Sequence, residues 1–249
     1  MQATLVASIL KDNHDAQLAL TIVHVLLFLA WLGVDTAVFY TSFRLRRPNL
    51  SAETRLELTH VLVFLDRSPR MASLLMAPIG ISLAFSGHLG LSGLSDGELN
   101  AIFWPLVALM LFMSWALVRF EHETNAGRTD TAFVKTYKLL LTLIKIALFG
   151  GFISTGILSL VGVDGLWNTH YIAWKAIVFG LITLAGQWIE WGFRDFAGAF
   201  GDLIANGETP ERLARLNTAV KGAYPPVLTL YGLVLAAAII GIASARGGF

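Results

Sequence analysis

The stretch Thr21 to Tyr40, TIVHVLLFLAWLGVDTAVFY, decides the fold, because it is an apolar run long enough to cross a lipid bilayer as one helix. The run nevertheless contains His24 and Asp35. An ionisable side chain inside hydrocarbon is costly unless it is paired or faces a cavity, so such residues indicate a functional site. At about 100° per residue, an α-helix places His24, Trp31 and Asp35 on one stripe. We therefore predict a transmembrane helix with one functional face.

The composition of the whole chain indicates a polytopic membrane protein. Of its 249 residues, 55% are hydrophobic and 14% are charged, and the apolar runs are too long for a soluble core. The net charge of +1 gives no indication of a nucleic-acid partner. The chain has no cysteine, which excludes disulfides, thiolate metal sites, iron–sulfur clusters and covalently attached c-type haem. Any redox cofactor must then be held by other side chains.

Six apolar segments have roughly the 20 residues that a spanning helix needs. We predict spans over residues 17–42, 70–87, 101–118, 136–161, 170–191 and 225–245. The loops after the first, third and fifth spans are rich in Lys and Arg, whereas loops 88–100 and 162–169 contain neither. The positive-inside rule places the basic loops in the cytoplasm and both termini outside. The expected fold is an all-α helical bundle, forming one membrane domain over residues 1–249.

Two basic loops carry helix signals. Ser51 begins a capping-box pattern, with Thr54 in place of the usual Glu, and apolar residues follow at helical spacing as far as Leu65. This pattern predicts a short interfacial helix. In the other loop, Thr209 is the predicted N-cap and Pro210 the first residue of a solvated cytoplasmic helix.

Depth in the membrane divides the polar residues into two groups. A rise of about 1.5 Å per residue places His24 about 10 Å below the outer surface and Asp35 in the inner half. The same count places His88 and His170 at the outer ends of the second and fifth spans, and Lys175 about 7 Å further in. The sequence thus predicts an outer site with up to four candidate ligands.

The inner half contains a second set of charges. Lys145 enters from the cytoplasmic end of the fourth span and reaches about the level of Asp35. The two residues either form an ion pair that neutralises both, or act as a proton or cation relay. At the inner end of the fifth span, Glu190 and Arg194 are spaced to pair along one helix. The alternative is a polar vestibule that they form with Asp35, Lys145 and Arg70.

The string His24-x6-Trp31-x-Gly33 in a first transmembrane helix resembles the start of two families. These are the CopD-type copper-resistance membrane proteins and the HemJ-type protoporphyrinogen oxidases. Three later stretches, covering with the first about half of the chain, are similar to the second, third and last helices of the oxidase family: Arg70-Met71 with Pro78, Trp174-Lys175, and the segment before Pro225-Pro226. The third and fourth spans would then be an insertion, because the oxidases usually have four helices. The resemblance implies b-type haem at His24, a functional Lys175 and a bacterial inner membrane.

Haem b is compatible with these residues independently of the resemblance. Haem iron binds a neutral imidazole, and a helical bundle can hold the macrocycle between two helices. His24 from one helix, with His170, His88 or Lys175 from another, would supply the axial ligands. The aromatic and small residues available for the pocket walls are Trp31, Trp104, Trp167, Trp174, Gly33 and Gly87. Two observations speak against haem. Tryptophans gather at membrane interfaces in any membrane protein. The pair of histidines within one span that is typical of four-helix b-type cytochromes is absent.

A metal ion is the alternative occupant of the outer site. The imidazoles of His24, His170 and His88 suit copper or zinc. Four methionines offer thioethers to Cu(I), or alternatively fill gaps in helix packing: Met71, Met76, Met110 and Met113.

Three functional hypotheses follow from different classes. The first is a haem b redox enzyme that oxidises an apolar porphyrinogen or quinol, with Lys175 and Asp35 as catalytic residues and His24, His170, Trp31 and Trp174 around the cofactor. The second is a copper or small-solute transporter that uses His24, Asp35 and Lys145. The third is a noncatalytic subunit, whose partners beyond the lipid bilayer are other membrane subunits or a second copy of the chain.

Overall fold

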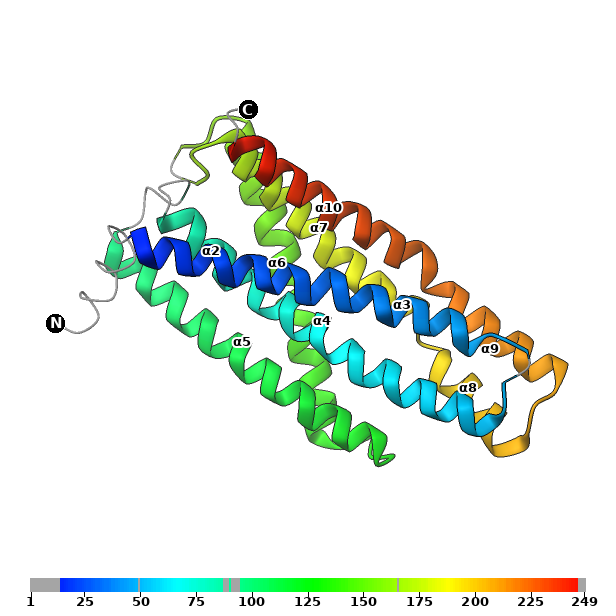
Figure 1. The fold of residues 1–249 in the computed structure, drawn as a ribbon. Helices are drawn as coiled ribbons and strands as arrows, with labels where there is room; N and C mark the ends of the chain where they lie inside the picture. The colour runs from blue at the N-terminus through cyan, green and yellow to red at the C-terminus, as the bar shows by residue number, and fades with distance from the viewer. Residues whose placement is uncertain (1–13, 49, 87–89, 91–94, 165, 246–249) are drawn as a thin grey trace.

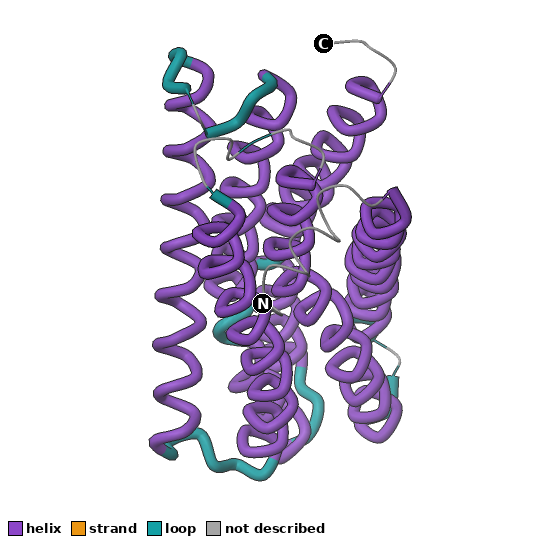
Figure 2. Tube along the Cα trace, turned by 90° about the vertical axis from the view of Figure 1, so that its left-hand side faces the viewer, coloured by secondary structure: helices purple, strands orange, loops and turns teal. Residues whose placement is uncertain are grey.

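The computed structural model describes residues 14–48, 50–86, 90, 95–164 and 166–245. Within these ranges the chain is helical and contains no strand, apart from one backbone bridge between Gly90 and Trp167. Figures 1 and 2 show long helices joined by short connections. The elements are α2 (His14–Phe28), the π-helical η1 (Leu29–Gly33), α3 (Val34–Leu45), α4 (Ala52–Ser86), α5 (Asp96–Asn125), α6 (Ala132–Leu160), α7 (His170–Gly192), α8 (Phe196–Asn206), α9 (Pro210–Gly222) and α10 (Tyr224–Ala245).

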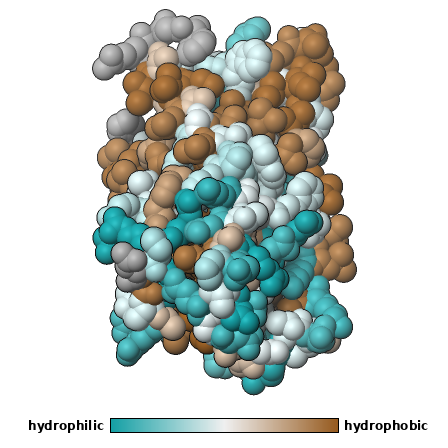
Figure 3. Space-filling model, turned by 90° about the vertical axis from the view of Figure 1, so that its right-hand side faces the viewer, coloured by the Kyte–Doolittle hydropathy of each residue, from teal (hydrophilic) through white to brown (hydrophobic). Residues whose placement is uncertain are grey.

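Six helical segments are long and apolar enough to cross a membrane, which confirms the predicted all-α, multi-pass bundle. The first segment runs through α2, η1 and α3 as one continuous rod (Figure 1). The start of α2 and the end of α10 lie at one end of the bundle, here called the terminal end. The predicted basic loops and the helices α8 and α9 lie at the other, the basic end. Figure 3 views the molecule from the side of α8 and α9, where hydrophilic residues gather in one zone beside a hydrophobic one.

The helix α4 differs from the prediction, because the expected interfacial helix and second span are one helix of 35 residues. Its start was predicted correctly, since the Thr54 N–H donates a hydrogen bond of 3.1 Å to the Ser51 hydroxyl. Pro69 and Pro78 lie inside the helix without ending it, as transmembrane helices tolerate. At 1.5 Å per residue α4 is about 50 Å long, well beyond the hydrocarbon thickness of about 30 Å. Its first turns therefore project from the membrane at the basic end.

At the basic end, α8 and α9 cover the junction of α3 and α4. Thr209 is the N-cap of α9, accepting a hydrogen bond of 3.3 Å from the Arg212 N–H, and Pro210 is its first residue, as predicted. The helix is not solvated all round, because Leu216 and Val220 are fully buried. They belong to an apolar cluster composed of Leu45, Leu62, Phe196, Ala199, Leu203, Leu216, Ala219 and Val220.

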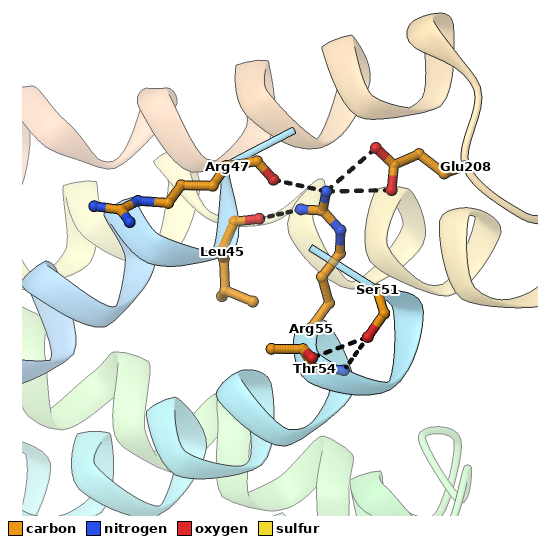
Figure 4. Close-up of polar contacts among 6 residues, drawn as sticks. All are labelled: Leu45, Arg47, Ser51, Thr54, Arg55 and Glu208. Atoms are coloured by element: carbon orange, nitrogen blue, oxygen red, sulfur yellow. Dashed lines mark hydrogen bonds and ion pairs between the residues drawn. The ribbon is translucent and has the colours of Figure 1, made fainter. Parts of the chain in front are cut away.

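Arg55 fixes this junction from within (Figure 4). Its side chain is fully buried, and its guanidinium donates hydrogen bonds to the carbonyl oxygens of Leu45 and Arg47, the latter at 2.8 Å. The same group forms an ion pair of 3.2 Å with Glu208, in the connection between α8 and α9. One buried cation thus joins the α3–α4 connection to the α8–α9 hairpin.

The helices α6 and α7 approach each other closely through glycines. A Cβ atom on Gly156 of α6 would lie 2.7 Å from the carbonyl oxygen of Ala173, and one on Gly180 of α7 would lie 2.7 Å from Ile153. Small residues at such positions allow transmembrane helices to pack backbone against backbone. The orientation of α7, which carries Lys175, is therefore fixed against α6.

Candidate functional site

The helix that carries His24 and Asp35 changes its winding between them. Residues Leu29–Gly33 form a π-helical turn, and the Ser68 hydroxyl of α4 donates a hydrogen bond of 3.4 Å to the Ala30 carbonyl oxygen within it. A π-turn holds more residues than an α-turn, so it changes the phase of the residues after it relative to those before. The predicted single stripe assumed uniform α-helical winding, which does not hold across this segment. Such π-helical turns occur frequently at functional sites.

The outer site brings together His24 and Lys175, two of its four predicted members. His24 is half-buried and faces α4, where a Cβ atom on Gly80 would lie 3.9 Å from the imidazole Cε1. The Lys175 ammonium lies over α10, 3.2 Å from where a Cβ atom on Gly241 would be. The two side chains are close enough to interact electrostatically. Four helices thus meet around an imidazole and an amine, with glycine on the two facing walls.

Nδ1 of His24 is buried and has no hydrogen-bond partner among the described residues. A buried nitrogen without a partner is unusual and calls for an explanation, such as a group that the structure does not contain. The imidazole of His24 is therefore a candidate ligand rather than a side chain satisfied by its helix neighbours.

The other predicted members of the outer site lie elsewhere. His170 is exposed at the start of α7, and the Trp174 side chain is 48% exposed on the outside of the bundle. His88 lies outside the described residues. No group of three or more His, Asp or Glu side chains that could hold a metal ion occurs in the described part of the chain. Met76, Met110 and Met113 are buried in apolar clusters, in agreement with the packing interpretation.

An apolar layer separates the outer site from the inner charges. Trp31, in the π-turn, is only 7% exposed and lies at the centre of this layer. Its side chains come from α4, α7 and α10 as well as from the first span: Trp31, Ala72, Met76, Ile182, Ala185, Leu230 and Val234. Trp31 is therefore part of the core between the two polar regions.

In the inner half, Lys145 does not pair with Asp35. Its ammonium forms an ion pair with Glu190 of α7 and lies 3.5 Å from the Gln187 amide oxygen. The predicted Asp35 to Lys145 ion pair is wrong because α6 packs against α7, and Lys145 pairs with Glu190 of that helix. Glu190 therefore pairs with Lys145 on the neighbouring helix and not with Arg194, as the helix spacing had suggested. The Arg194 guanidinium lies 3.6 Å from the Asp195 carboxylate instead.

Asp35 has a different set of neighbours, of which only Arg70 belonged to the predicted vestibule. It lies beside the Tyr231 hydroxyl of α10, and Asp66 and Arg70 of α4 act on it electrostatically. Asp66 and Arg70 form an ion pair along α4. Their spacing of four residues could have revealed this pair, but not that α4 turns it toward Asp35.

These charges form a connected network in the inner half, which we call the inner polar cluster. Arg70 of α4 interacts electrostatically with Glu190 of α7 and with Glu121 of α5. Glu121 is itself buried and pairs with Arg67 at 2.7 Å. The cluster draws a residue from each of the six spans: Asp35, Asp66, Arg67, Arg70, Glu121, Lys145, Glu190 and Tyr231.

Comparisons with models of known families, with curated proteins and with solved structures found no match for this chain. The resemblance to the CopD-type and HemJ-type families therefore stays a prediction.

Proposed function

We propose that this protein is a redox protein of the bacterial inner membrane that holds b-type haem through His24. The observation that supports the proposal is the meeting of His24 and Lys175 in the outer half, opposite Gly80 and Gly241. Glycine at these two positions lets the His24 and Lys175 side chains lie close to the backbones of α4 and α10.

The donor set suits haem better than a bare metal ion. A bare copper or zinc ion takes most of its ligands from the protein. The porphyrin of haem supplies the equatorial ligands itself and needs axial ligands only. One imidazole and one amine, as found here, would be an incomplete site for an ion and a complete axial pair for haem. When bound, haem would supply one-electron redox chemistry.

The remaining residues have roles in binding and in proton exchange. Lys175 would supply its side-chain amine beside His24, and Trp31 and its apolar neighbours exclude water between the two polar regions. Oxidation of a porphyrinogen or quinol at the outer site would release protons on that side of the apolar layer, and its electrons would pass on to an acceptor outside this chain. Asp35 and Tyr231 belong to the inner polar cluster, beyond the apolar layer, where they would exchange protons with the cytoplasm.

The absorption spectrum of the purified protein tests this function, with His24→Ala and His170→Ala as a matched pair. Both variants remove one imidazole in the terminal half, but only His24 faces the outer site. We expect a Soret band in the wild type and in His170→Ala, and its loss in His24→Ala. Equal spectra in the two variants would rule out His24 as the ligand.

A transporter is the second candidate, and the surroundings of Asp35 favour it. Among the described residues no cation lies within ion-pair distance of Asp35, so its carboxyl is available to a travelling proton or cation. If the protein is such a transporter, Asp35→Asn should abolish ion flux in proteoliposomes. Thr36→Val, at the exposed position next to Asp35, should keep the flux. Flux that persists in Asp35→Asn would exclude this candidate. A noncatalytic subunit would instead purify with stoichiometric partners and no cofactor.

A further inference from the structure

A cavity of about 230 Å³ lies between α4, α5 and α6. The helices α5 and α6 diverge from their short connection toward the terminal end (Figure 1). Near that connection they are tightly packed, with Met113 and Leu117 of α5 in one cluster with Tyr137 of α6. The cavity occupies the region further along, where the two helices have separated. Its walls include Ile81, Phe103, Ala147, Gly151, Phe152 and Trp167.

The cavity reaches the surface that faces lipid. Ile102, Ala147 and Gly151 line it and are exposed on the outside of the bundle. On the far side of α4 lies Gly80, which contacts His24, so the cavity and the outer site are separated by one helix. The cavity is therefore distinct from the outer site, and hydrocarbon can enter it sideways from the bilayer.

The polar groups of the cavity are few. The hydroxyls of Ser82 and Thr155 donate to carbonyl oxygens of their own helices, at 2.9 and 2.7 Å. The remaining walls are aliphatic and aromatic, with Phe152 and Trp167 stacked at 6.5 Å between ring centroids. The indole N–H of Trp167, in the α6–α7 connection, is buried away from the open cavity and has no acceptor among the described residues. The walls that the described residues form are thus almost entirely hydrocarbon, without an accessible donor.

We propose that this cavity binds an acyl chain of a membrane phospholipid. An acyl chain has no polar group that needs a partner, which matches apolar walls open to the lipid-facing surface. A quinone ring carries carbonyls on opposite edges, and both would be left against apolar walls without a donor, at an energetic cost. The proposal does not depend on haem binding.

Gly151 and Gly150 provide a matched pair of variants to test the site. A Cβ atom at either position would meet no atom within 4 Å, but only Gly151 lines the cavity. Leucine favours a helix more than glycine does, so both variants should keep α6 intact. Gly151→Leu fills the cavity, whereas Gly150→Leu adds the same bulk to the outside of the helix.

The measurement is photo-crosslinking in nanodiscs made with a phospholipid that carries a diazirine within one acyl chain, followed by mass spectrometry of the labelled peptides. We expect crosslinks at Phe103 and Phe152 in the wild type and in Gly150→Leu, and a severalfold loss in Gly151→Leu. Ala147→Leu, at a second lining position, replaces Gly151→Leu if that variant is not monodisperse. Crosslinks no more frequent in the cavity than at Ile239 on the exposed face of α10, or unchanged by both filling variants, would overturn the proposal. Displacement of the cavity crosslinks by a short-chain quinone would assign the site to a ring ligand instead.

Discussion

Arg55 shows how much one residue can determine in this chain. A charged side chain is almost never fully buried unless it is paired, and Arg55 is completely enclosed with two carbonyl oxygens and one carboxylate as partners. It holds together two connections that are more than 150 residues apart in the sequence, since its hydrogen bond to Glu208 spans 153 positions. The basic end therefore depends on this side chain more than on any exposed charge.

Replacing Arg55 with methionine should destabilise the protein by about 2–3 kcal/mol, because buried acceptors lose a charged donor. Glu208→Gln should cost less than about 1 kcal/mol, because the Glu208 side chain is 35% exposed and solvent screens the pair. Thermal unfolding of the detergent-solubilised variants measures both. A Glu208→Gln effect as large as that of Arg55→Met would show that the ion pair, and not the carbonyl contacts, stabilises the junction.

At the scale of elements, the packing of α6 on α7 determines where Lys175 and Lys145 lie. Gly180→Leu should separate the two helices, because its Cβ atom would lie 2.7 Å from Ile153 and 3.2 Å from the Phe149 carbonyl oxygen. We expect a loss of about 1–3 kcal/mol in stability, as for overpacked cores. Gly186→Leu is the control on the same helix, since a Cβ atom there meets nothing within 4 Å. A comparable loss in both variants would mean that α7 is sensitive to bulk in general.

The stability that the capping box contributes at the first turn of α5 should depend on pH. The Ser95 N–H donates a hydrogen bond of 2.9 Å to the Glu98 carboxylate, and the Ser95 hydroxyl donates another of 2.7 Å. These bonds hold the pKa of Glu98 below its ordinary value of about 4.5. Because the folded-state pKa is depressed, this capping contribution is complete above that value and is lost as the pH falls through the folded-state pKa. An NMR titration of the labelled carboxyl should show the low midpoint in the wild type and a higher one in Ser95→Ala; equal midpoints would contradict the capping box.

At the scale of the whole molecule, hydropathy and loop charge predicted the position of each residue along the membrane normal. The six spans and the shared depth of His24 and Lys175 were predicted in this way. The partner of Lys145 could not be predicted, because equal depth does not show which helices are neighbours, and α6 packs on α7. The π-turn at Leu29–Gly33 has no periodic signature in the sequence, and Tyr231 looked like any residue of an apolar helix.

The whole bundle thus has an outer site, an apolar layer around Trp31 and an inner polar cluster. The haem content per chain tests most directly whether the outer site holds haem. We predict that wild-type protein from haem-replete membranes contains close to one haem b per chain by the pyridine haemochrome assay, and that His24→Ala contains almost none at equal helical content. A wild type with only a trace of haem, or a His24→Ala variant that keeps the wild-type content, would contradict the account.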